Sequence, residues 1–223
     1  MKKSLGDSDY EKNGSCSHSK NYIMPGYYSP DNGELVTLFL VEEQKIDRVA
    51  RIKKWTVQFN VEFDSIINGK KDFFTFLNYN GIDSISSYLD MQKGQLTLNL
   101  MTIEEVGELQ AIELQLPNAP VSPFLYISIA YDNDSQQLKV LFAETSSNYV
   151  KNTYKLGGHL GYFGAETSLV FYGTVNTKIT NVAFDYSNAE TIAEMTAEMN
   201  KYARKVQKDC LVGTATQCTK CQI

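Results

Sequence analysis

The sequence predicts an all-β fold in which two antiparallel sheets form a sandwich, followed by one amphipathic helix at the C-terminus. Short stretches of alternating apolar and polar residues, separated by turn signals, run from residue 35 to residue 186. After residue 187 the apolar residues recur every three or four positions, which indicates a helix. A closed barrel is the alternative. The clean polar face of several strands favours the sandwich, because antiparallel sheets tolerate one solvated side.

The clearest strand is predicted at residues 55–63. Its large apolar side chains, which alternate with polar ones without a break, are Trp55, Val57, Phe59, Val61 and Phe63. Trp, Val and Phe suit a pleated, half-buried surface. We therefore expect this strand in the middle of a sheet, with its apolar face in the core. Its other face carries a single charge and is expected to be solvated or turned toward a ligand.

The remaining strands are predicted around turn signals. Residues 1–34 are rich in Ser, Gly, Asp and Asn and predict a flexible arm, which we expect to be partly pinned by Tyr22, Ile23, Tyr27 and Tyr28. The first strand is expected at 35–41. Asn68-Gly69 predicts a hairpin between the central strand and residues 73–77, because both positions of a type I′ turn need positive φ. Further strands are predicted, in chain order, at 88–91, 95–100, 112–116, 124–131, 138–142, 169–172 and 179–186.

Two connections stand out among these strands. Residues 132–135 form a polar turn that predicts a hairpin between 124–131 and 138–142. Residues 143–166 are rich in glycine and are expected to be irregular. The sandwich domain is thus assigned to residues 35–187.

The helix is predicted at residues 188–208, and a cysteine-containing tail follows at 209–223. Ser187 and Glu190 have the spacing of a capping box, in which each side chain satisfies a free amide of the other residue. The apolar stripe that we expect to pack against the sandwich consists of Ile192, Met195, Met199, Tyr202 and Val206.

Composition excludes several functions. The net charge is −5 and no basic run occurs, so nucleic acid is not an expected partner. No apolar run approaches the ~20 residues of a membrane span. No secretory signal is visible at the N-terminus, so we expect either a cytosolic protein or a chain that is processed or partial.

The order of the strand patterns resembles laminin G-like and concanavalin A-like jelly-roll domains over residues 33–190. The matching stretches are 55–59, 73–77, 94–98, 124–132, 138–140 and 174–186. This resemblance implies a jelly-roll sandwich that binds glycans or extracellular proteins, often with calcium at its rim. The tail is similar to the start of the cysteine-rich segments of protist surface proteins.

An enzymatic function is not expected. Glycan hydrolases of jelly-roll fold carry the signature Glu-x-Asp-x-x-Glu, because an acid and a nucleophile must flank the scissile bond. Glu62 and Asp64 match its first two positions, but position 67 is Ile. The two histidines, His18 and His159, belong to no catalytic motif, and we interpret His159 as a loop residue.

No cofactor is expected with certainty, and calcium is the one metal for which ligands are available. Its candidates are Asp132, Asn133 and Asp134 at the predicted 132–135 turn, with Asp83 and Asp90 as further carboxylates. Turns favour Asp and Asn for backbone reasons, so these residues are also explained without a metal.

The four cysteines, Cys16, Cys210, Cys218 and Cys221, all lie outside the predicted sandwich. We favour disulfides, whose pairing among three arrangements stays open; zinc ligation and free thiols are the alternatives. Asn13 and Asn133 begin N-glycosylation triplets.

Together these features favour a non-catalytic structural or interaction module that contacts other proteins in an extracellular or cell-surface assembly. The alternative function is a lectin-like domain that binds glycans, with calcium assisting. An intracellular scaffold is the alternative for the compartment.

Overall fold

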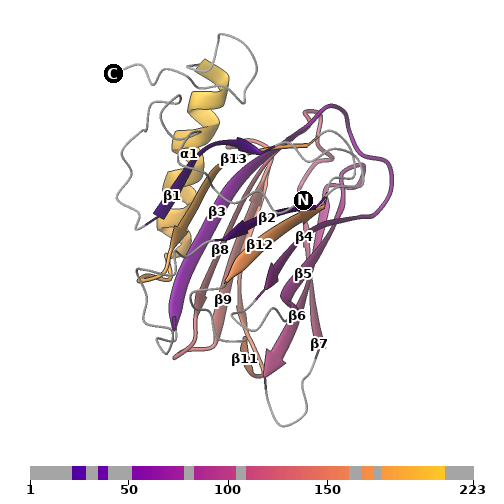
Figure 1. Ribbon diagram of the computed structural model, residues 1–223. Coiled ribbons are helices and arrows are strands. Elements are labelled where there is room, and N and C mark those ends of the chain that lie inside the picture. Colours follow the sequence, from indigo (N-terminus) through magenta and orange to yellow (C-terminus); the bar gives the residue numbers. More distant parts are fainter. Residues whose placement is uncertain are drawn as a thin grey trace.

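The computed structural model describes residues 22–28, 35–39, 52–77, 83–103, 109–160, 167–172 and 177–208. Within these ranges two antiparallel sheets pack face to face, and one helix lies against the outside of the first sheet (Figure 1). The predicted sandwich is confirmed, and the structure shows no closed barrel in the described part of the chain.

The first sheet, sheet A, has the central strand in its middle, as predicted. Its order is β1 (Tyr22–Tyr28), β13 (Thr177–Asp185), β3 (Lys54–Phe63), β8 (Phe124–Asp132), β9 (Gln137–Ala143) and β10 (Tyr149–Lys155). β1 lies within the predicted arm, and it pins residues 22–28 to sheet A: they pair with β13 from Tyr22 opposite Phe184 to Tyr28 opposite Ile179, although a strand was not predicted there. The predicted hairpin of β8 and β9 is confirmed, with Asp132 opposite Gln137.

The second sheet, sheet B, has the order β11 (His159–Leu160), β6 (Gln95–Ile103), β5 (Asp83–Asp90), β4 (Lys71–Leu77), β12 (Ser168–Tyr172) and β2 (Leu35–Phe39). β7 (Leu109–Gln115) also pairs with β6. β10 and β11 both fall in the segment that was expected to be irregular, so that prediction is wrong for residues 149–155 and 159–160, whereas residues 144–148 and 156–158 are irregular as expected.

The predicted hairpin of β3 and β4 is also wrong. Gly69 has a φ of +73°, but Asn68 does not have a positive φ, so the predicted type I′ turn is not formed, and the connection carries the chain from sheet A to sheet B. β3 and β4 therefore pack face to face, and the rings of Phe59 and Phe74 lie 5.3 Å apart, edge to face. Two strands that share a core show the same alternation as two strands that share hydrogen bonds, so the pattern alone did not separate these arrangements.

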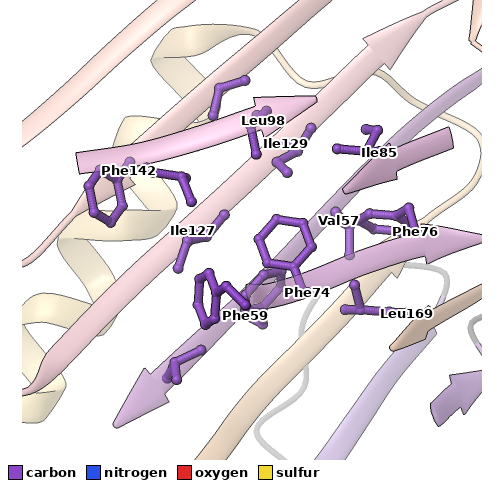
Figure 2. Packing of buried hydrophobic residues seen from close by; sticks show 14 of the residues in the cluster. Val57, Phe59, Phe74, Phe76, Ile85, Leu98, Ile127, Ile129, Phe142 and Leu169 are labelled. Carbon is purple, nitrogen blue, oxygen red and sulfur yellow. The ribbon is translucent and has the colours of Figure 1, made fainter. Parts of the chain in front are cut away.

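The core lies between the two sheets (Figure 2). The labelled side chains from sheet A are Val57, Phe59, Ile127, Ile129 and Phe142, and those from sheet B are Phe74, Phe76, Ile85, Leu98 and Leu169. Every one of them has an exposed fraction of 0%. Apolar alternation on both sheets thus produces one continuous core, as it does in sandwich folds.

The helix, α1 (Ile192–Lys208), begins later than predicted. Its capping box consists of Thr191 and Glu194, and the proposed box at Ser187 and Glu190 is wrong. The Thr191 amide donates to Glu194 Oε2 at 2.7 Å, and the Glu194 amide donates to Thr191 Oγ1 at 3.3 Å. Ser187 instead donates to the Asp185 carboxylate, which forms a turn ahead of the helix. Both boxes have the same spacing, so sequence alone did not choose between them.

The apolar side of α1 docks on the outer face of sheet A, over β9 and β10, as the predicted stripe requires. Met195 and Met199 are buried there with Tyr126, Ala130, Leu141 and Ala143, and Ile192 packs beside them. The side chains of Tyr202 and Val206, the other members of the predicted stripe, lie outside the described residues.

The polar face of β3 is buried, which corrects the expectation of a solvated face. Thr56, Gln58 and Asn60 are each only 1% exposed. Thr56 Oγ1 donates to the carbonyl of Asn188 and accepts from the amide of Glu190, so this strand holds the segment that leads into α1.

Candidate functional site

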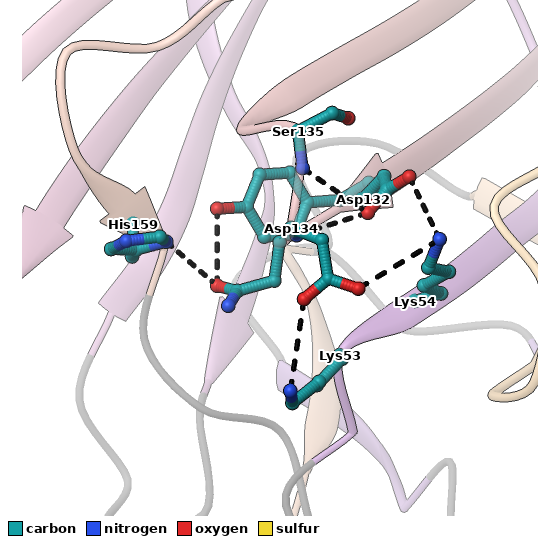
Figure 3. Close-up of polar contacts among 8 residues, drawn as sticks. Lys53, Lys54, Asp132, Asp134, Ser135 and His159 are labelled. Atoms are coloured by element: carbon teal, nitrogen blue, oxygen red, sulfur yellow. Dashed lines mark hydrogen bonds and ion pairs between the residues drawn. The ribbon is translucent and has the colours of Figure 1, made fainter.

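The turn between β8 and β9 contains the predicted calcium ligands (Figure 3). Asp132 Oδ1 accepts hydrogen bonds from the amides of Asp134 and Ser135, at 3.0 and 3.4 Å. This is the turn geometry by which an aspartate side chain replaces a backbone carbonyl. Asp132 Oδ2 accepts from Lys54 Nζ at 3.1 Å. The carboxylate of Asp132 therefore stabilises the turn and holds a lysine of the neighbouring strand.

The second carboxylate of the turn also faces lysines. Asp134 Oδ1 lies 3.7 Å from Lys53 Nζ, and its Oδ2 lies 3.9 Å from Lys54 Nζ (Figure 3). Asp134 and Lys53 are more than half exposed, so their ion pair contributes little to stability. Both carboxylates thus have an ammonium group where a calcium ion would need open oxygen atoms.

Asn133 turns toward a different partner. Its Oδ1 atom accepts from the Tyr131 hydroxyl at 3.4 Å and lies 3.1 Å from His159 Nδ1. His159 belongs to β11, and its Nε2 atom lies 3.3 Å from Gln136 Nε2. Sequence reasoning placed His159 in an irregular loop, and no local signal showed that β11 would bring it to this turn.

The electrostatics of Asp132 agree with this structural role. Partial burial pushes the pKa of Asp132 upward, but the hydrogen bonds from Lys54 and from the amides of Asp134 and Ser135 outweigh it, so the pKa is lowered overall. Within the described ranges, no group of three or more His, Cys, Asp and Glu side chains is arranged to hold a metal ion. Calcium binding at this turn stays a prediction, and it requires displacement of the lysines.

The other predicted residues do not assemble into a site. Asp90 caps its own turn, where it accepts from the Lys93 amide and pairs with Lys93 Nζ at 3.3 Å. Glu62 lies half-buried on the outer face of sheet A, whereas Asp64 is exposed beyond the end of β3. Burial raises the pKa of Glu62, Lys178 opposes this rise and Asp64 adds to it. The side chain of Asp83, together with Asn13, His18 and all four cysteines, lies outside the described residues.

The outer face of sheet B carries a second group of polar residues, which sequence reasoning did not single out. Tyr88 on β5 and Tyr172 on β12 are half-buried, and neither belongs to the core or packs against it. The other half-buried tyrosines of the described chain, Tyr149, Tyr154 and Tyr186, do pack against buried clusters. One strand, β4, separates β5 from β12, so the two rings leave the sheet about 10 Å apart.

Polar side chains lie between and beside these tyrosines. Thr75 on β4 is opposite Ser86 on β5, which is opposite Asn99 on β6. We call these residues, with Tyr88 and Tyr172, the tyrosine face. Ser86 and Asn99 are half-buried, and Met101, two residues further along the same side of β6, is 39% exposed. The β5–β6 half of the tyrosine face is therefore accessible to a ligand.

Two contacts position the rings of the tyrosine face. The Tyr172 hydroxyl and Thr75 Oγ1 lie 3.1 Å apart and share a hydrogen bond. Lys70 Nζ lies 4.6 Å from the centroid of the Tyr88 ring, within the range of a cation–π contact. Because Lys70 is exposed, a ligand is able to displace it from the ring.

Neither protein-family models nor the sequences of curated proteins match this chain. Similarity appears only among solved structures. One is the binding domain of botulinum neurotoxin serotype D, with a TM-score of 0.55 and 10% identity; the match covers 82% of this chain and 44% of the neurotoxin domain. Another is the sialidase carbohydrate-binding module CBM40 of Ruminococcus gnavus bound to α2,3 sialyllactose, with a TM-score of 0.52 and 10% identity over 80% of this chain and 97% of that module.

At 10% identity these similarities show the fold alone: the chain is a β-sandwich like those of the two binding domains. Among the described residues, no helix is both long and apolar enough to span a membrane.

Proposed function

We propose that this domain binds glycans without catalysing a reaction, and that the tyrosine face is its binding surface. The observation that carries the proposal is the placement of Tyr88 and Tyr172. They are half-buried, they leave the same side of sheet B, and they pack against neither buried cluster. Single half-exposed rings are common on protein surfaces, but two rings on one sheet face with polar side chains between them form the kind of surface that a ligand can use.

The chemistry of the tyrosine face suits a sugar. A pyranose ring presents an apolar C–H face, which packs on an aromatic ring, and hydroxyls around its rim, which need both donors and acceptors. Ser86 and Asn99, which lie opposite each other next to Tyr88, supply a hydroxyl and a carboxamide. The two similar binding domains support the proposal by fold, because one of them holds sialyllactose.

The absence of catalysis is part of the proposal. A retaining glycan hydrolase needs two carboxyl groups about 5–5.5 Å apart at the scissile bond. Glu62 lies on β3 of sheet A and Asp64 follows the end of that strand, and Ile67, at the third position of the hydrolase pattern, is 4% exposed. Neither carboxylate is therefore on the tyrosine face. We also expect this protein to be extracellular or at the cell surface, because glycans and glycoconjugates are exposed there.

A glycan array probed with the full chain tests the proposal. We expect binding to at least one glycan class, and a loss of at least ten-fold in apparent affinity for Tyr88→Ala and for Tyr172→Ala. Thr153→Ala, at an exposed position on β10, is the matched control and should leave binding unchanged. Binding that survives EDTA separates this site from a calcium-assisted one. An array without any bound glycan, or full binding by both tyrosine variants, contradicts the proposal and leaves a protein-interaction module.

A further inference from the structure

The strand between the two tyrosines, β4, contains a β-bulge. Its register with β5 shifts between the pair of Asp72 and Tyr88 and the pair of Thr75 and Ser86. Between these two pairs the chain advances by three residues on β4 and by two on β5, so β4 carries one extra residue. Because side chains alternate along a strand, an extra residue changes the side of the sheet that the preceding residues face.

The bulge is fixed by a serine inside the core. Ser87, which is 2% exposed, accepts a hydrogen bond from the Phe74 amide at 2.9 Å and donates one to the Phe74 carbonyl at 2.8 Å. Phe73 and Phe74 are consecutive, yet both are buried in the core. In an unbroken strand Asp72 would face the same side as Phe74 and would enter the core. The bulge instead leaves Asp72 exposed, on the outer side of sheet B.

Asp72 lies between the strands that carry the two tyrosine rings. Tyr88 is its cross-strand partner on β5, so the two side chains share one side of the sheet. Tyr172 follows the last pair that β12 forms with β4, on the opposite flank of β4. Within the described part of the chain, the Asp72 carboxylate has no hydrogen-bond or ion-pair partner. The bulge therefore places an open hydrogen-bond acceptor between two rings.

We propose that Asp72 is a glycan-binding residue, and that the tyrosine face takes a linear glycan of at least three sugar units that lies across the strands. This inference rests on the function proposed above. The rings leave strands β5 and β12, which are separated by two strand spacings of ~4.8 Å each. A pyranose unit advances a linear glycan by about one such spacing, ~5 Å. The first and third units thus pack on Tyr88 and Tyr172, and a single sugar cannot contact both rings.

The middle unit of this glycan lies over Asp72. Its hydroxyls donate to the carboxylate, and hydrogen bonds to a charged acceptor are stronger than those between neutral groups. The negative charge of Asp72 also repels an acidic sugar at this position. The middle unit is therefore a neutral sugar with free hydroxyls.

A length series tests how the glycan lies on the full chain. The probes are linear glucans, galactans, mannans and xylans of one to six units, printed as an array. For at least one series, apparent affinity should rise at least ten-fold from one unit to three and change less than three-fold beyond three. Tyr172→Ala should remove this rise. Equal affinity for one and three units overturns the inference. If no series binds, the inference is also wrong, and the function proposed above is decided by its own glycan array.

The role of Asp72 is tested with the three-unit glycan that binds best. Asp72→Ala should lower affinity at least ten-fold without changing the urea midpoint, because Asp72 is exposed. Glu113→Ala is the matched control. Glu113 is also an exposed carboxylate, and Thr97 is opposite both Tyr88 and Glu113, so Glu113 lies two strands beyond the Tyr88 ring, outside the span of three units. Full binding by Asp72→Ala, or an equal loss with Glu113→Ala, overturns the inference, whereas the tyrosine variants still test the tyrosine face itself.

Discussion

Phe59 and Gln58 are adjacent on β3 and lie on opposite faces, so their replacement by alanine measures the two sides of the strand separately. The Phe59 ring is 0% exposed and contacts Phe171, Phe74 and Phe73, with centroid distances of 5.0, 5.3 and 6.5 Å, all edge to face. Truncation of a buried Phe to Ala costs about 3–5 kcal/mol. The stiff rings around Phe59 cannot collapse into the cavity, so we expect about 4–5 kcal/mol.

Gln58→Ala should cost less, but more than a solvated position would. Gln58 is 1% exposed, and its Oε1 atom accepts from the Tyr126 hydroxyl at 3.1 Å. Loss of a buried hydrogen bond costs about 1–2 kcal/mol, whereas surface changes stay within about 0.5 kcal/mol. Urea unfolding, followed by the fluorescence of the single tryptophan, Trp55, gives both values. A Gln58→Ala cost below about 0.5 kcal/mol would show that this face is solvated. Equal costs for both variants would refute the one-sided core.

Four further predictions concern pH, turns and cysteines. Because the pKa of Asp132 is lowered in the fold, its ionised carboxylate stabilises the protein at pH values above the unfolded pKa of about 4. Asp132→Asn should therefore lower the urea midpoint at pH 7, and this loss should disappear once the pH falls below the folded pKa. The raised pKa of Glu62 has the opposite effect on stability, which falls as the pH rises from the unfolded pKa through the folded pKa of this group. Glu62→Gln should therefore raise the urea midpoint at pH 7, and this gain should disappear below about pH 4. Both Gly69 and Gly94 have positive φ. A Cβ atom added at Gly94 would lie 3.0 Å from Pro120 Cδ, whereas one added at Gly69 would meet no atom within 4 Å. Thermal unfolding should therefore show that alanine costs about 1 kcal/mol of stability at Gly69 and roughly 2–3 kcal/mol at Gly94. Non-reducing mass spectrometry of native protein should find the four cysteines mostly oxidised, and four free thiols would contradict an extracellular location.

The fold class was predictable because alternation and burial have the same physical cause. β3 was placed mid-sheet, and β8 and β9 were paired correctly, since each has a continuous apolar face. The failures concern how strands are joined. A turn signal such as Asn68-Gly69 specifies local dihedral angles and says nothing about which sheet receives the next strand. β10, with mostly exposed or half-exposed side chains, has no apolar stripe to detect.

The sites were less predictable because they depend on contacts between distant parts of the chain. Asp132 was recognised as a candidate, but its partner Lys54 is 78 residues away and approaches only because β3 pairs with β8. The tyrosine face needs two facts that no sequence pattern supplies. Tyr88 and Tyr172 must lie on strands separated by a single strand, and their rings must remain outside the buried clusters.

The polar face of β3 shows the limit of alternation most directly. An alternating pattern reports that one side of a strand is apolar, and the other side is then assumed to meet water. In this chain that other side is buried, although its residues are those of a solvent face: Gln58 and Asn60 on β3 and Ser128 on β8. Among the described residues, α1 docks through Met195, Met199 and Ile192, and hydrogen bonds to Thr56 and Lys139 hold the segment before it. This apolar cluster is much smaller than the sandwich core, so α1 should detach at urea concentrations at which the core around Phe59 is still intact.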